Sequence, residues 1–465
     1  MAMSETAARW LAATVVCVQA GSAAVAWGAE AVSVTAAAAW RELLARPDPP
    51  AAKEHLDAVL AACGRDVGAL RRLIASDAAY APIEAGWHSR SVQIRGADGK
   101  REDVRFAIRV PRSYRPDRAH AVLVAAHGQH GSGRQMAAMI ARLLGGEAER
   151  YILVAPTLPG PRHYSGKAYQ ERAYLEPLRW VRRRLNVDDD RICITGYSQG
   201  GHCTWHLATL YARHFAAAVA MAGVPWFEGA PHTANMYLEN LEHLPLWAIW
   251  GEKDAPAPPA IGQVHFCRSA TRRLEELGNG LYRGTELPGV GHGGCWPNGR
   301  KLAAFLAAGR RKAAPLRVTH FFHLEHHKRG YWLEANRLAA RPMRMDRPIR
   351  VRFSRRPSET DGEKAMDRYF RRYLFKMWGE VDRETNTLTV RTSRVTSVRI
   401  YLIDGLLDLS RPVTLKFGRR SWRGEVPASA RCMLHHYADT RDATALVVNE
   451  IDLPVTARAL IRYKP

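Results

Sequence analysis

The chain has 465 residues, enough for two or three domains, of which 47% are hydrophobic and 24% charged. This ordinary globular composition excludes a collagen-like, coiled-coil or wholly disordered protein. Beyond the N-terminus no run of 18 or more strongly apolar residues appears, which excludes a polytopic membrane protein. The formal net charge of +23 favours attraction to polyanions, but it is also typical of arginine-rich chains from a GC-rich genome, so it selects no partner.

Residues 1–29 are expected to form a cleaved export signal. Arg9 supplies one positive charge, and residues 10–29 are uncharged and rich in Ala, Val, Gly and Ser. Ala26-Trp27-Gly28 fits the small-x-small pattern of a signal peptidase site, and so does Ala20-Gly21-Ser22. Cleavage there would give an exported protein, periplasmic or extracellular, without a membrane span. The alternatives are an uncleaved anchor and a cytosolic N-terminal helix.

Six cysteines would remain after that cleavage, and the sequence alone selects no pairing among them. Cys193 lies in a short apolar stretch and is expected to be a buried free thiol. The chain has no CxxC pair and no Cys/His spacing typical of zinc. We therefore expect neither a cofactor nor a metal.

Residues 30–87 are expected to form an N-terminal helical segment, because apolar residues recur at helical spacing. Two alternating stretches, 91–94 and 104–110, flank a glycine-containing turn and predict an antiparallel hairpin at a sheet edge. Further along, within a domain that we assign to residues 88–312, continuous apolar strands alternate with helices. This pattern is typical of a mostly parallel sheet covered on both faces, an α/β fold. The expected strands are 121–126, 151–155, 191–195, 215–220, 246–250 and 282–287.

After a linker at 313–315, residues 316–465 are expected to form a mostly β accessory domain. It holds 30 Lys and Arg against 17 Asp and Glu. Aromatic and basic residues mingle between 369 and 378, where we expect an amphipathic helix that packs its aromatic side chains on the β domain. The expected strands are 318–325, 331–338, 349–353, 387–391, 397–402, 413–417 and 446–449.

The motif Gly196-Tyr197-Ser198-Gln199-Gly200 follows a short apolar strand and precedes a helical stretch. This is the context of a nucleophile elbow, a strand-to-helix turn that lifts a serine hydroxyl out of the sheet. Glycines two residues before and after the serine are needed because the turn leaves no room for side chains there. The sequence therefore predicts Ser198 as a nucleophile.

Two later strands end in residues that would complete a catalytic triad. Asp254 follows the strand 246–250, at the edge of an open α/β sheet where active sites lie. His292 lies in a glycine-rich loop after the last strand, where its imidazole can approach Ser198. The chain order serine, acid, histidine is that of the α/β hydrolases. Glu252 is the competing acid.

Stabilising an oxyanion needs two backbone donors. The amide of Gln199, directly after the serine, is one. The glycine-rich stretch His127-Gly128-Gln129-His130-Gly131 after the strand 121–126 supplies the second, with the Gln129 amide as the expected donor. We expect His127 to hold its own loop and to take no catalytic part.

On these motifs the catalytic part, roughly residues 88–310, resembles the α/β-hydrolase superfamily. It is most similar to secreted bacterial esterases related to dienelactone hydrolases, polyhydroxyalkanoate depolymerases and the catalytic domains of prolyl oligopeptidases. Fewer than about 90 residues precede it, so the large upstream propeller of prolyl oligopeptidases is absent. The segment 222–245 is too short for a lipase-like helical lid, and an open site suits a bulky or polymer-borne ester.

Four histidines between 320 and 327 surround Glu325. A solvated edge hairpin is the expected structure. The alternative is zinc binding by His323, Glu325 and His327, which would share one face of a strand.

The leading hypothesis is an exported serine hydrolase that cleaves a carboxylic ester through a Ser-His-Asp triad and an acyl-enzyme. The alternatives are a prolyl oligopeptidase-type peptidase and a polyanion- or carbohydrate-binding protein with a vestigial hydrolase domain. The expected partner is a small-molecule or polymer-borne ester, and the basic C-terminal domain suggests an acidic polysaccharide. Nucleic acid is not favoured, since no recognition motif accompanies the charge.

Overall fold

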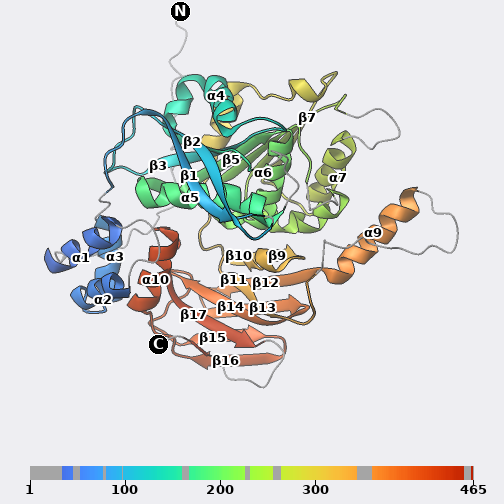
Figure 1. Cartoon of the computed structure of the whole chain (residues 1–465). Helices are drawn as coiled ribbons and strands as arrows, with labels where there is room; N and C mark the ends of the chain where they lie inside the picture. Colours follow the sequence, from blue (N-terminus) through green and yellow to red (C-terminus); the bar gives the residue numbers. More distant parts are fainter. Residues whose placement is uncertain are drawn as a thin grey trace, which may run out of the picture.

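The structure is a computed structural model of the whole chain (Figure 1). It describes residues 34–45, 53–76, 80–96, 98–159, 167–225, 231–254, 263–342, 359–454 and 462–463. The expected export signal at 1–29 and the expected strand at 349–353 lie outside these ranges. Among the described helices, none has the length and apolarity that crossing a membrane requires.

The described N-terminal residues form three helices, as the spacing predicts: α1 (Val34–Ala45), α2 (Lys53–Ala62) and α3 (Val67–Ser76). They pack beside α10 (Ala430–Thr440) of the C-terminal part, far away in the sequence (Figure 1). Trp40 stacks on Tyr437 with ring centroids 5.4 Å apart. The two ends of the described chain therefore share one core.

An eight-stranded sheet forms the centre of the molecule, in the order β1-β2-β4-β3-β5-β6-β7-β8. The β1–β2 hairpin joins β4 in antiparallel fashion, and the other neighbours are parallel. This is the α/β-hydrolase fold that the sequence predicts. The strands are β1 (Gly86–Arg95), β2 (Arg101–Val110), β3 (His120–Ala126), β4 (Tyr151–Pro156), β5 (Val187–Tyr197), β6 (Ala217–Met221), β7 (Leu246–Gly251) and β8 (Tyr282–Leu287).

Helices cover both faces of this sheet because its strands are apolar on both sides. On β3, Leu123 and Ala125 join the core beneath α4 (Gly133–Leu144) and α8 (Gly299–Ala308), whereas Val122 and Val124 face the opposite core. That second core contains α5 (Ala168–Arg184), α6 (Gln199–Leu210) and α7 (Gln263–Glu276), and it continues into the C-terminal part.

The C-terminal part is rich in β structure, as expected, with sheets in the orders β10-β11-β14-β17-β18 and β16-β15-β13-β12-β9. Its strands lie below α5 and α6 in Figure 1, so these helices are covered on both sides. The elements are β9 (Arg317–Phe322), β10 (Arg329–Gly330), β11 (Leu333–Leu338), α9 (Glu359–Tyr373), β12 (Phe375–Asp382), β13 (Thr387–Ser393), β14 (Val395–Ile403), β15 (Val413–Phe417), β16 (Arg420–Gly424), β17 (Val447–Pro454) and β18 (Arg462–Tyr463).

The expectation of one amphipathic helix from 369 to 378 is wrong at its C-terminal end. Helix α9 ends at Tyr373, and β12 begins at Phe375. Phe375, Met377 and Val381 alternate towards the core, which is the period of a strand.

The expectation of a solvated hairpin around Glu325 is also wrong. His320, His323 and His327 are buried, and Glu325–His327 is a short 3₁₀ helix, η5. The alternative in which His323, Glu325 and His327 share one face fails as well. His323 bonds to Tyr237 and to the Phe370 carbonyl, whereas His327 points to a different carboxylate.

The cysteines left open by the sequence, Cys63, Cys193, Cys203, Cys267, Cys295 and Cys432, are all buried free thiols. The expectation for Cys193 is confirmed, since its side chain is buried in the core under α4 and α8. Burial raises the pKa of the Cys193 thiol to about 12, so this group is protonated and unreactive.

A buried arginine joins the hydrolase part to the C-terminal part. Arg311, after α8, forms two parallel hydrogen bonds to Asp442, with N–O distances of 2.6 and 2.8 Å. Asp190 binds the same guanidinium, and Asp189 lies close by, paired with Arg182 at 2.8 Å. Against the opposing effect of burial, Arg311 lowers the pKa of Asp442; burial and the Asp442 charge raise the pKa of Asp189 to about 7. The cluster therefore depends on the arginine charge.

We predict that Arg311→Ala lowers the free energy of unfolding by about 3–5 kcal/mol, because it removes both hydrogen bonds to the buried Asp442 and leaves Arg182, at 3.6 Å, as its nearest cation. Urea denaturation followed by circular dichroism measures this. Arg310→Ala is the matched control, since Arg310 is 68% exposed and 3.7 Å from Asp188; its effect should stay within about 0.5 kcal/mol. Equal effects of the two changes would contradict the assigned role of Arg311.

Candidate active site

Ser198 occupies the sharp turn between β5 and α6. Its φ of 58° and ψ of −118° are strained for a residue with a side chain. A Cβ on Gly196 would lie 2.2 Å from the Gly200 carbonyl oxygen, and one on Gly200 would lie 1.9 Å from the Ala126 oxygen. Both positions therefore require glycine, for the reason that the sequence motif indicates.

The structure brings Ser198, His292 and Asp254 together at the carboxyl ends of β5, β8 and β7. His292 Nε2 lies 2.9 Å from Ser198 Oγ, and His292 Nδ1 lies 2.9 and 3.0 Å from the two Asp254 carboxylate oxygens. Asp254 is buried, whereas the His292 side chain is 42% exposed. A substrate can therefore reach the imidazole while the carboxylate stays shielded from water.

The hydrogen bond that His292 donates to Asp254 raises the pKa of His292 above its usual value, and burial only partly opposes this. Since an ionised carboxylate only accepts hydrogen bonds, Nδ1 carries the proton and Nε2 of the neutral ring presents a lone pair to the serine hydroxyl. This arrangement suits proton transfer from Ser198 Oγ to His292 Nε2.

Glu252, the competing acid, points elsewhere. Its carboxylate accepts a hydrogen bond from the Gly289 backbone amide at 2.7 Å, in the turn before the histidine loop. Gly289 has a φ of +69°, which explains the glycine at this turn.

Two aromatic residues that the sequence reasoning missed hold the histidine loop. The Tyr197 hydroxyl donates to the His292 carbonyl, and its ring stacks on Trp296 with centroids 4.3 Å apart and planes 3° apart. Trp296 Nε1 donates to the Gly293 carbonyl at 3.2 Å. In the sequence, Tyr197 is an aromatic residue inside the serine motif and Trp296 is one just after the histidine loop. They are far apart in the chain, so the sequence does not indicate that their rings stack.

The loop after β3 lies beside the serine. A Cβ on Gly128 would lie 3.5 Å from Ser198 Cβ. His127 is buried; its Nδ1 donates to the Gly128 carbonyl at 2.7 Å, and its Nε2 accepts from the Leu158 amide at 3.0 Å. His127 thus holds its own loop, as expected. Gln129 follows in this loop and Gln199 begins α6, and their amides remain the predicted oxyanion donors.

Residues 100–273 match the model of the family Esterase. Over these residues the chain is similar to esterases of the α/β-hydrolase superfamily. The match includes Ser198 and Asp254 and ends before His292, which lies in a short 3₁₀ helix after β8. No curated protein matches the chain.

Solved structures with a similar fold include a thermostable esterase, 21% identical, with a TM-score of 0.38 over 48% of this chain and 63% of that one. The poly(3-hydroxybutyrate) depolymerase LpqC from Bordetella parapertussis is 19% identical, with a TM-score of 0.35 over 48% and 94%. An acetyl xylan esterase from Aspergillus awamori is 15% identical, with a TM-score of 0.37 over 47% and 99%. The chain thus spans under two thirds of the thermostable esterase.

We predict that Tyr197→Phe lowers kcat for an ester substrate about 2- to 10-fold, because it removes one hydrogen bond to the histidine loop and keeps the stacking on Trp296. Steady-state kinetics measure this. Tyr151→Phe removes a hydroxyl that has no partner within the described residues, at the opposite end of the sheet, and should leave kcat unchanged. Wild-type kcat in the Tyr197 variant would show that the loop needs no such support.

Proposed function

We propose that the chain is an exported serine esterase that hydrolyses a carboxylic ester through an acyl-enzyme. The observation that carries the proposal is the unbroken line of hydrogen-bonding distances from Ser198 Oγ through the His292 ring to the buried Asp254. A vestigial hydrolase domain would have no reason to keep the strained serine turn, since such strain costs on the order of 1–3 kcal/mol.

In the first half-reaction Ser198 Oγ attacks the ester carbonyl carbon while its proton passes to His292 Nε2. The amides of Gln199 and Gln129 bind the oxyanion of the tetrahedral intermediate. As that intermediate collapses, His292 gives the proton to the leaving alcohol, and the acyl group remains on the serine. Asp254 stays ionised and stabilises the imidazolium.

In the second half-reaction a water molecule takes the place of the alcohol. His292 removes a proton from the water as it attacks the acyl carbon, and the same oxyanion donors act again. Collapse returns the proton to Ser198 Oγ and releases the carboxylic acid. The cycle consumes one ester and one water.

The substrate that we propose is a bulky or polymer-borne ester. Residues 231–241, which form the 3₁₀ segment η3 between β6 and β7, pack on α6, α7 and β9. Asn240 makes two hydrogen bonds to the Phe321 backbone, at 2.7 and 2.9 Å. This segment thus fastens the C-terminal part, and it is not available as a helical lid.

Two test substrates distinguish an esterase from a peptidase. A short-chain nitrophenyl ester should be turned over, whereas an aminoacyl-prolyl amide should not. The reverse preference would favour the prolyl oligopeptidase-type alternative.

Binding of acidic polysaccharide by the basic C-terminal part is a separate hypothesis. It is tested by salt-dependent retention of the purified chain on such a polymer.

We predict that Ser198→Ala abolishes covalent labelling by a fluorophosphonate and lowers ester turnover by about four to six orders of magnitude, because the nucleophile is lost. Labelling is read on a gel and turnover by nitrophenol release. An unchanged circular dichroism spectrum controls for folding. Full activity of this variant would overturn the whole catalytic assignment.

We predict that Asp254→Asn lowers kcat by about 10⁴-fold, because an amide no longer fixes the imidazole tautomer. It should also move the acidic limb of the kcat/KM profile to lower pH. The Asp254 bond raises the pKa of His292, so without it the base stays unprotonated at lower pH.

Glu252→Gln is the matched control for Asp254→Asn. The amide oxygen of glutamine can still accept the Gly289 N–H, so activity and pH profile should both stay near wild type. If Glu252→Gln lost most of its activity while Asp254→Asn lost little, Glu252 rather than Asp254 would be the acid that binds His292.

A further inference from the structure

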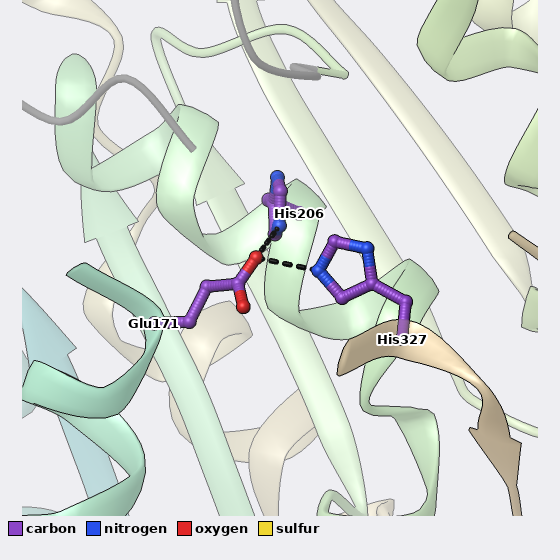
Figure 2. A group of neighbouring side chains, drawn as sticks. All are labelled: Glu171, His206 and His327. Atoms are coloured by element: carbon purple, nitrogen blue, oxygen red, sulfur yellow. Dashed lines mark hydrogen bonds and ion pairs between the residues drawn. The ribbon is translucent and has the colours of Figure 1, made fainter. Parts of the chain in front are cut away.

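Three side chains from distant parts of the chain converge at the boundary between the hydrolase helices and the C-terminal part. Glu171 projects from α5, His206 from α6 and His327 from η5 (Figure 2). Both imidazole Nε2 atoms point at the same carboxylate oxygen, Glu171 Oε1, at 2.5 Å from His206 and 2.6 Å from His327. Their donor atoms all lie within 4.8 Å of one another.

This cluster is fully enclosed. Glu171, His206 and His327 are each at most 1% exposed. Among the described residues, no lysine or arginine forms an ion pair with the Glu171 carboxylate. A buried carboxylate is costly unless a positive charge or several hydrogen bonds compensate it, and here the groups aimed at it are imidazole nitrogens and the Tyr211 hydroxyl.

We propose that Glu171, His206 and His327 bind a divalent transition-metal ion, with zinc as the expected occupant, which fastens the C-terminal part to the hydrolase helices. Two imidazole nitrogens and one carboxylate oxygen are typical zinc ligands. Ligand atoms about 2.0–2.2 Å from a tetrahedral ion lie about 3.3 Å apart, so each Nε2 needs to move by less than about 1 Å from Glu171 Oε1.

A further nitrogen donor is present on the same turn. His326 Nε2 lies 3.4 Å from the second Glu171 oxygen, and its side chain is 36% exposed. His326 lies outside the group whose donor atoms are all within 4.8 Å of one another, so its side chain would have to turn inward to become the fourth ligand; its exposed ring gives an ion a route from solvent. A closed four-coordinate site is typical of structural zinc.

A second group with suitable donors, Cys432, His436 and Glu450, does not support the same inference. Glu450 already lies 3.6 Å from the Arg399 guanidinium, which places a fixed positive charge beside the carboxylate. The Glu171 cluster has no such cation among the described residues, and of these two groups it is the one that joins helices of the hydrolase part to the C-terminal part.

The test uses the tag-free, purified full chain after dialysis against metal-free buffer. Inductively coupled plasma mass spectrometry should find about one zinc ion per wild-type chain. Glu171→Gln and His327→Asn should each lower the zinc content at least about tenfold, since each removes one ligand. His323→Gln is the matched control, because His323 is equally enclosed in the same segment but bonds to Tyr237 and Phe370; its zinc content should equal that of the wild type.

The wild-type chain alone gives a second readout, in case the variants do not fold. A chelator should lower its melting temperature and added zinc should restore it, because an ion that binds only the folded state stabilises that state. Cobalt(II) added after chelation should give the intense visible absorption of a four-coordinate site. A wild-type chain that neither carries zinc nor takes up zinc or cobalt would overturn the proposal, as would uptake that is unchanged in both ligand variants.

Discussion

The close approach of the start of α6 to the end of β3 determines where the proposed catalytic residues lie. Gly200 at the start of α6 lies so near the end of β3 that a side chain would meet the Ala126 carbonyl oxygen at 1.9 Å. This contact fixes the first turn of α6 against the sheet, and the serine before it must take up a left-handed backbone conformation. The loops after β3, β7 and β8 then lie within reach of one hydroxyl, because parallel strands end at the same edge.

The hydrolase sheet and the C-terminal part share one hydrophobic core, because α5 and α6 pack between them. The buried apolar residues of these helices belong to the same core as Phe322, Trp332 and Phe375. Polar groups that lie in this boundary must be satisfied there. Arg311 with Asp442, and Glu171 with its histidines, do this through charged and hydrogen-bonded groups, and both connect the two parts.

Ser198, Asp254 and His292, which the structure brings together, could be proposed from the sequence because each stands in a local pattern. The elbow needs only five consecutive residues, and Asp254 and His292 follow strands whose apolar runs are easily recognised. The mostly parallel sheet follows from the same alternation of strands and helices, whereas the order β4-β3-β5 within it does not. The predicted roles of Gln129 and Gln199 depend on backbone orientation, which no local pattern specifies.

The boundary contacts could not be predicted because their partners are far apart in the chain. Glu171 precedes His327 by 156 residues, and on a helix rich in Arg and Glu it resembles a solvated side chain. The histidines near Glu325 were expected in solvent because the residues that cover them, on α5 and α6, are far away in the sequence. Phe375 was wrongly assigned to a helix because the aromatic residues at the end of α9 are followed almost at once by the alternating residues of β12, so the change from helical to strand spacing is hidden.

Helix α6 connects the boundary to the active site. Ser198 precedes its first residue and His206 lies eight positions later, about 12 Å along the helix axis at 1.5 Å per residue. An ion held by His206 is therefore too far from the serine to polarise an ester carbonyl, which requires direct coordination. Its effect on the reaction would pass through the helix: the first turn of α6 carries the Gln199 amide, and oxyanion stabilisation depends on a donor held rigidly in place. The proposed serine triad would thus act without help from this ion, and an ion in the Glu171 cluster would stabilise the helix on which that triad is built.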